Sequence, residues 1–229
     1  MPPFKVATFD CYGTLVDWEG GAAAFLYDLA RRNGDRDPGP GRLLRERWEE
    51  IQFEMIQSDY RAYRDVLAES LRTWVGERGY RWNTREADAF EHAMQSWQPF
   101  PDTVPALSRA KKAGMRLVII SNTDRHIMER TLHQLSPLTF DAVVVSEDVR
   151  SYKPDTAAFT RALRAAGAKP EEILHVAFGF KYDIRPAREV GLGTAWVNRH
   201  REEPPGDERP DHEWRDLWGL AELAESQRT

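Results

Sequence analysis

Acidic, basic and polar residues stand at or just after the ends of several short apolar segments of this 229-residue chain. Asp10 ends the first segment, Ser121 and Asn122 end the second, and Lys153 and Asp183 follow two later ones. A carboxylate that is held in line with its target and relieved of water can act as a nucleophile. A nearby ammonium group keeps such a carboxylate ionised. These residue types therefore favour covalent catalysis by an aspartate.

The apolar segments that carry these residues have the pattern of strands in a parallel sheet. They are rich in Val, Ile and Phe and lack clean alternation, which is typical of strands covered on both faces. Helical spacing lies between the later segments, as at Met128, Leu132 and Leu135, and strand–helix alternation favours a parallel sheet. Ligands bind beyond the carboxyl ends of such strands, so we expect the polar residues to share one edge. The predicted strands are residues 4–9, 116–121, 141–146, 173–180 and 194–197.

Residues 18–97 have a different character. Apolar stripes at helical spacing recur there, and no strand-like segment interrupts them. We interpret this part as a helical cap inserted after the first strand, with a core formed by residues 1–17 and 98–229. The expected fold class is α/β, a Rossmann-like parallel sheet with an inserted helical cap. A polar surface loop is expected at residues 200–210, before a last helix near residues 217–224.

Composition and charge limit the classes of function. The net charge is −5 and the charged residues are interspersed, so no long basic run follows a nucleic-acid backbone. No apolar segment reaches the ~20 residues of a membrane-spanning helix, and no apolar signal core precedes the first strand. The single cysteine, Cys11, favours a reducing cytoplasm. We therefore expect a cytoplasmic protein with a small-molecule substrate, no nucleic-acid or membrane partner, and a homodimer as an open possibility.

Four short motifs occur in order along the chain. They are DCYGTL at residues 10–15, SN at 121–122, YKPD at 152–155, and Asp183 followed by GLGTAWVNR at 191–199. Together these motifs resemble the haloacid dehalogenase superfamily, most closely its 2-haloacid dehalogenase branch. The resemblance implies a hydrolase in which Asp10 forms a covalent ester or acyl phosphate, Lys153 stabilises charge and Asp183 guides water. The substrate-binding residues expected on this basis are Tyr12, Thr14, Ser121, Asn122, Phe178 and Phe180.

The residue two positions after Asp10 favours one reaction over another. Phosphatases of the superfamily carry a second Asp where this chain has Tyr12, and Gly-Asp where it has Ala177-Phe178. A phenol with a pKa of ~10 is a poor acid for a leaving group, and displacement of halide needs no acid. Only Asp10 and Asp183 remain as carboxylate ligands for a hard cation. We therefore expect metal-independent attack on an electrophilic carbon, without a cofactor.

Departures from the 2-haloacid dehalogenase pattern leave two alternatives open. The cap segment that carries an Arg in that branch has Glu49 here, and Phe159, Phe178 and Phe180 stand where the branch has polar residues. Each change replaces a polar contact by an apolar or oppositely charged one, which indicates a drier pocket and a less anionic substrate. The alternatives are a Mg²⁺-dependent small-molecule phosphatase and a degenerate protein that binds a ligand without turnover.

The candidate residues also have purely structural interpretations. Asp10 could cap the turn after its strand, and Asp183 could cap the helix that follows it. Lys153 could extend into solvent, as long cationic side chains commonly do. Ser121 and Asn122 could form a turn. His175, inside the fourth predicted strand, is interpreted as a core histidine and is left out of the site.

Overall fold

The computed structural model describes residues 4–227 and divides into two compact units. Within the described residues, the sheet unit comprises residues 4–16, 99–122 and 135–227. The helical unit comprises Asp17–Gln98 and Thr123–Gln134. The predicted core ranges extend at both ends beyond the described residues, and the division into a core and a cap with the stated boundaries stays a prediction.

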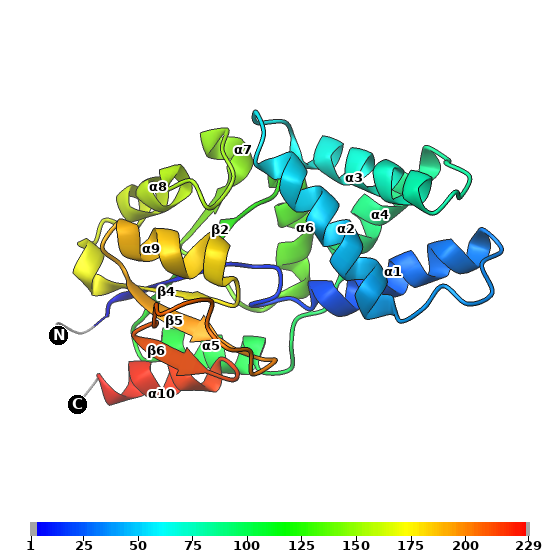
Figure 1. The fold of residues 1–229 in the computed structure, drawn as a ribbon. Coiled ribbons are helices and arrows are strands. Elements are labelled where there is room, and N and C mark those ends of the chain that lie inside the picture. The colour runs from blue at the N-terminus through cyan, green and yellow to red at the C-terminus, as the bar shows by residue number, and fades with distance from the viewer. Residues whose placement is uncertain (1–3, 228–229) are drawn as a thin grey trace. The chain divides into compact units, whose positions relative to one another are not determined.

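The sheet unit is built on six parallel strands in the order β3-β2-β1-β4-β5-β6 (Figure 1). β1 and β4 are buried at every residue, which explains their unbroken apolar sequences. The strand order reverses between β1 and β4, and such a switch point is where doubly wound folds bind ligands. The predicted Rossmann-like α/β class is confirmed. The strands are β1 (Val6–Phe9), β2 (Arg116–Ser121), β3 (Ala142–Val145), β4 (Ile173–Ala177), β5 (Gly193–Val197) and β6 (His212–Trp214).

The predicted strands differ from the observed ones chiefly at β4. The prediction extended this strand to residue 180, but β4 ends at Ala177 and a π-helical turn, Phe180–Ile184, follows. Phe180 therefore belongs to the turn and not to the strand. β6 was not predicted, because its three residues are partly exposed and show no apolar pattern. The apolar sequence continues beyond the end of the strand because the Phe180 side chain is buried. This continuation explains why the predicted strand is too long.

Helices cover both faces of the sheet (Figure 1). The apolar stripe of α8 includes Phe159 and Ala162, which pack in one buried cluster with Val118 of β2 and Val144 of β3. α5 and α10 pack against each other on the opposite face. The helices of this unit are α5 (Thr103–Lys112), α7 (Ser146–Val149), α8 (Ala157–Ala166), α9 (Arg185–Glu189) and α10 (Trp218–Ser226), together with a short 3₁₀ turn at Pro170–Glu172.

The helical unit has an aromatic interior. Phe90 lies 4.7 Å from Phe25 and 4.9 Å from Trp48, measured between ring centroids, and the Trp48 indole N–H donates to Ser70 Oγ at 3.0 Å. The helix α4 was not predicted, because it buries only Phe90 and Met94 and so carries a short apolar stripe. The helices are α1 (Trp18–Arg32), α2 (Gly41–Ile56), α3 (Tyr63–Glu77), α4 (Arg85–Ser96) and α6 (Arg125–Gln134).

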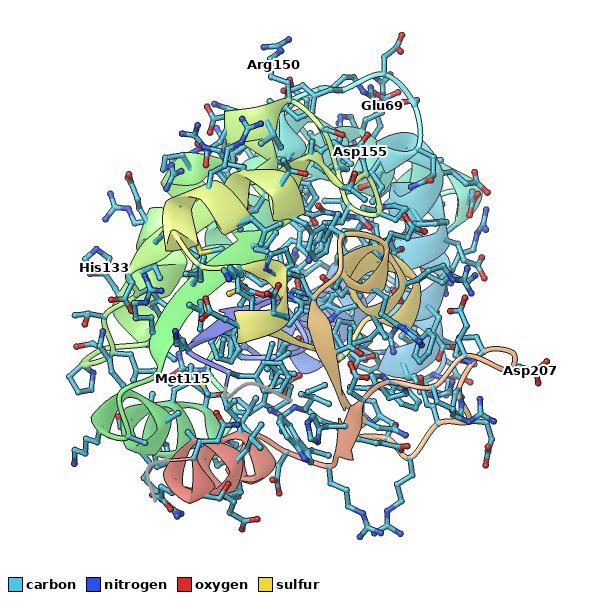
Figure 2. The ribbon with its side chains drawn as sticks, turned by 90° about the vertical axis from the view of Figure 1, so that its left-hand side faces the viewer. Glu69, Met115, His133, Arg150, Asp155 and Asp207 are labelled. Atoms are coloured by element: carbon cyan, nitrogen blue, oxygen red, sulfur yellow. The ribbon has the colours of Figure 1, made fainter. Side chains whose placement is uncertain are left out.

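A polar loop follows β5, as the sequence predicts. Its residues are mostly exposed, and Asp207 lies at its far end, pointing away from the sheet (Figure 2). Within residues 4–227, no helix combines the length and the apolar character that crossing a membrane requires.

Candidate active site

A tight turn after β1 brings Thr14 back to Asp10. The amides of Leu15 and Val16 donate to the Cys11 carbonyl at 2.8 and 3.1 Å, and Gly13 adopts a φ of +95°, which favours glycine. The turn places Thr14 Oγ1 at 2.9 Å from Asp10 Oδ2, to which it donates a hydrogen bond. Asp10 therefore has one carboxylate oxygen fixed by its own loop.

Thr14 also joins this loop to the segment after β4. Its hydroxyl accepts a hydrogen bond from the Phe178 amide at 3.0 Å while it donates to Asp10. The Phe178 carbonyl in turn accepts from the Trp196 indole N–H at 2.8 Å. Gly13 allows this approach, because a Cβ there would lie 2.4 Å from the Phe178 ring. Two neighbouring strand ends are thus held together around the candidate nucleophile.

Lys153 is buried with only 2% of its surface exposed. Its ammonium donates to Asp10 Oδ1 at 2.9 Å, to Asp183 Oδ1 at 2.5 Å and to the Ile120 carbonyl at 3.2 Å. An ammonium group has three protons, and each one has an acceptor inside the protein. The structure therefore contradicts the interpretation of Lys153 as a solvated surface residue.

Asn122 holds the backbone of Lys153 in place. Its side-chain Nδ2 donates to the Lys153 carbonyl at 3.1 Å, and its Oδ1 accepts from the Lys153 amide at 2.7 Å. Ser121 lies beside it at the end of β2, and its buried hydroxyl has no hydrogen-bond partner among the described residues. Buried hydroxyls normally have partners, so this one is open to a bound group. Substrate contacts by Ser121 and Asn122 stay predictions.

Asp183 lies in the π-helical turn and is 2% exposed. Its Oδ1 accepts from Lys153 and lies 3.2 Å from His175 Nε2. The other ring nitrogen, Nδ1, lies 2.9 Å from Thr8 Oγ1 on the neighbouring strand. His175 is a buried core residue, as predicted, but it also contacts a candidate catalytic carboxylate, which the sequence analysis missed. The only signal in the sequence was a pair of polar residues inside two apolar strands.

Asp10 and Asp183 are both buried and share the ammonium group of Lys153. Burial and this shared charge determine the pKa values of the two carboxyl groups. Burial raises the pKa of Asp10 to about 6; the negative charge of Asp183 adds to this rise, and Lys153 and Thr14 oppose it. For Asp183, the penalty of burial is outweighed by Lys153 and His175, so its pKa is lowered. The pKa of Lys153 is raised, because the two carboxylates outweigh its own burial. At neutral pH Asp10 is therefore ionised, yet it is more basic than an exposed carboxylate.

The aromatic residues predicted to bind substrate lie in different environments. Tyr12 and Phe178 are partly exposed. Phe180 is 7% exposed and packs edge-on against Trp196, with ring centroids 5.4 Å apart, in a cluster that includes Ile184. This packing gives Phe180 a structural role, and substrate contact by any of the three aromatic residues stays a prediction.

The two carboxylates at the site are already engaged by a buried ammonium group. Asp10 Oδ1 and Asp183 Oδ1 both accept hydrogen bonds from the Lys153 ammonium, and Tyr12 and Phe178 supply no further carboxylate. Hard cations such as Mg²⁺ prefer several oxygen ligands. Within residues 4–227, no group of three or more His, Cys, Asp or Glu residues is arranged to hold a metal.

Glu49 of the helical unit forms an ion pair with an arginine on its own helix. Arg45, one turn earlier on α2, pairs with Glu49 at 2.6 Å and with Glu19 at 2.7 Å, and its guanidinium lies over the Trp18 ring. Burial raises the pKa of Glu49, although Arg45 opposes the rise. The resemblance to the 2-haloacid dehalogenase branch implies an arginine at the position of Glu49. This chain has an acid there, together with a compensating base one turn earlier.

Comparison with known proteins gives a consistent picture. A family model described as haloacid dehalogenase-like hydrolase matches residues 4–191. The (S)-2-haloacid dehalogenase of Pseudomonas sp. strain YL is 27% identical over 234 residues, covering 99% of this chain and 97% of the relative. (S)-2-haloacid dehalogenase H-109 of Pseudomonas putida is 26% identical, covering 87% of this chain and 88% of that protein.

Solved structures have the same fold. A crystal structure of an L-2-haloacid dehalogenase superposes with a TM-score of 0.86 at 26% identity, covering 97% of this chain and 99% of that one. The L-2-haloacid dehalogenase of Xanthobacter autotrophicus, solved with chloropropionic acid covalently bound, gives a TM-score of 0.81 at 22% identity, covering 96% of this chain and 98% of that one. At 22% identity, the likeness to the Xanthobacter autotrophicus structure concerns the fold alone.

Proposed function

Because the chain belongs to the haloacid dehalogenase-like hydrolases, we propose that it hydrolyses a small halogenated acid through attack by Asp10 on the carbon that bears the halogen. Arg45 pairs with Glu49 and offsets the acid that indicated a less anionic substrate. The observation that carries this proposal is the buried carboxylate of Asp10, fixed by Thr14 on one oxygen and by Lys153 on the other. A carboxylate that is ionised, oriented and largely removed from water is a competent nucleophile.

In the first step a carboxylate oxygen of Asp10 displaces the halide. A carbon–oxygen bond forms, the carbon–halogen bond breaks, and the halide leaves with its electron pair. The leaving group needs no proton, so Tyr12 is compatible with this chemistry. Lys153 remains protonated and stabilises the charge around the site, in keeping with its raised pKa.

In the second step water cleaves the ester. A water molecule oriented by Asp183 attacks the carboxyl carbon of Asp10, and the bond between that carbon and the substrate-derived oxygen breaks. The products are a hydroxy acid, halide and a proton, and Asp10 is restored with one oxygen from water. No metal ion or cofactor enters either step.

The remaining predictions concern partners and location. We propose a cytoplasmic protein that works on small molecules without a nucleic-acid partner, supported by the single buried Cys11 and by the interspersed charges. Association of the chain as a homodimer stays a prediction.

The direct test is halide release from both enantiomers of a 2-halopropionate and from a haloacetate. The wild-type protein should release halide, whereas Asp10→Asn should show no activity above background, because the amide is not a nucleophile. Aryl phosphates are assayed separately as alternative substrates, and the release of phosphate is measured. Phosphate release that exceeds halide release would contradict the proposal.

A further inference from the structure

His175 makes two hydrogen bonds that together determine its protonation. Nε2 faces the carboxylate of Asp183 at 3.2 Å, and Nδ1 faces the hydroxyl of Thr8 at 2.9 Å. An ionised carboxylate only accepts hydrogen bonds, so Nε2 must carry a proton. Burial lowers the pKa of His175 and favours the neutral ring. In the neutral ring Nδ1 accepts, and the Thr8 hydroxyl is its donor.

Both donors to Asp183 converge on the same oxygen. Lys153 Nζ and His175 Nε2 contact Oδ1, and no described residue donates to Oδ2. Oδ2 lies close to the backbone of Gly179, where an added Cβ would be only 2.7 Å away. The absent side chain at Gly179 therefore keeps space beside Oδ2.

We propose that His175, oriented by Thr8, is a positioning residue that holds Asp183 with Oδ1 toward Lys153 and leaves Oδ2 to orient the water that cleaves the ester. This inference rests on the proposed function. The hydrogen bond from Lys153 constrains Oδ1 from one direction only and leaves the carboxylate some rotational freedom. A second donor from the rigid strand β4 removes that freedom, because His175 is held in register with Thr8 of β1.

The variants follow from this geometry. His175→Phe keeps a ring edge-on to Phe159, whose centroid is 5.0 Å away, and removes both hydrogen bonds. His175→Gln restores an N–H near the position of Nε2. Thr8→Val removes the donor to Nδ1. Thr194→Val is the matched control, because Thr194 is the other cross-strand neighbour of His175 and bonds Asp211 instead.

The readout separates ester formation from ester hydrolysis. Rapid quench followed by intact-protein mass spectrometry measures the ester on Asp10 during a single turnover. His175→Phe should form the ester at close to the wild-type rate and hydrolyse it about 10- to 100-fold more slowly, the penalty expected for a misplaced group. Ester should accumulate. His175→Gln should recover much of the hydrolysis rate, Thr8→Val should lose part of it, and Thr194→Val should match the wild type.

Equal slowing of both steps in His175→Phe, without recovery in His175→Gln, would overturn the inference and leave His175 a packing residue. Absence of any Asp10-bound ester in the wild type would instead contradict the proposed function. A nitrogen-15 NMR spectrum of the histidine rings provides a test that needs no substrate. A neutral ring protonated at Nε2 is expected at neutral pH, and a charged ring or one protonated at Nδ1 would overturn the inference.

Discussion

Lys153 donates to Asp10, Asp183 and the Ile120 carbonyl, so its ammonium is fully used inside the protein. The environments of the two carboxylates that it joins separate their pKa values, in keeping with the different tasks that we propose for them. The pKa of Asp10 is raised by burial and that of Asp183 is lowered by its donors. A more basic carboxylate suits a nucleophile, whereas a carboxylate that stays ionised suits the orientation of water.

The raised pKa of Asp10 predicts a pH dependence of catalysis. Only the ionised form attacks, so kcat/KM should rise with pH, with a midpoint at about 6, and then level off. Below the midpoint the value should fall about tenfold per pH unit, as expected for loss of one essential base. Measurement of halide release across this range tests the prediction. A profile that falls as pH rises through 6 would show that the protonated form is the active one.

Removal of Lys153 should destabilise the fold as well as the chemistry. Lys153→Met leaves two buried carboxylates without a counter-charge, and breaking a buried ion pair typically costs about 3–5 kcal/mol. Urea unfolding at neutral pH measures the free energy. The control is Lys181→Met, since Lys181 is exposed on the π-helical turn that contains Asp183. Similar stabilities of the two variants would argue against a charged, buried Lys153.

At the scale of elements, the turn after β1 connects Asp10, the proposed nucleophile, to the rest of the site. Arg199 donates to the Thr14 carbonyl at 2.9 Å and pairs with Asp102 through two hydrogen bonds of 3.0 Å. The Leu217 amide also donates to Asp102. The loop is therefore held from its backbone as well as through its side chains.

Gly13 should be much less replaceable than another glycine of positive φ. Gly13→Ala requires both a strained φ of +95° and displacement of the Phe178 ring, whereas Gly39→Ala at φ +83° meets nothing within 4 Å. The strain alone costs roughly 1–2 kcal/mol. Urea unfolding should show a clearly larger loss for Gly13→Ala, accompanied by reduced halide release. Equal losses would mean that the ring contact is unimportant.

The sequence predicts the elements better than their ends. Short apolar runs, most of them rich in Val, Ile or Phe, indicate β1, β2, β3 and β5, and most residues of these strands are buried. The end of β4 is misplaced because periodicity does not distinguish a strand from an apolar π-helical turn. Asp10, Lys153 and Asp183 could be chosen as candidates from the sequence, because each ends or follows a predicted strand. The link through His175 depends on register between β1 and β4, which spans 167 positions along the chain and leaves no local pattern.

At the scale of the whole molecule, the fold and the chemistry of the site place different limits on function. Parallel sheets of this kind support many reactions, so the reaction must be inferred from the residues at the strand ends. Tyr12 and Phe178 replace the acids expected in phosphatases, and Lys153 joins the two carboxylates that remain. This combination favours chemistry on carbon over phosphoryl transfer.

Metal removal tests this distinction. Halide release should be unchanged after dialysis against EDTA and unchanged again when Mg²⁺ is restored, because the ammonium of Lys153 supplies the positive charge at the site. An authentic Mg²⁺-dependent phosphatase treated in parallel provides the control for complete removal. Loss of activity on chelation with recovery on addition of Mg²⁺ would favour the phosphatase alternative.

The central claim is that Asp10 forms an ester that water then cleaves at the carboxyl carbon. A single turnover in heavy-oxygen water, with enzyme in excess over substrate, tests it most directly. Peptide mass spectrometry should find one heavy oxygen in the Asp10 carboxylate, and the hydroxyl oxygen of the product should be light because it comes from the enzyme. A heavy hydroxyl in the product together with an unlabelled Asp10 would mean that water attacks the substrate directly, and the account would be wrong.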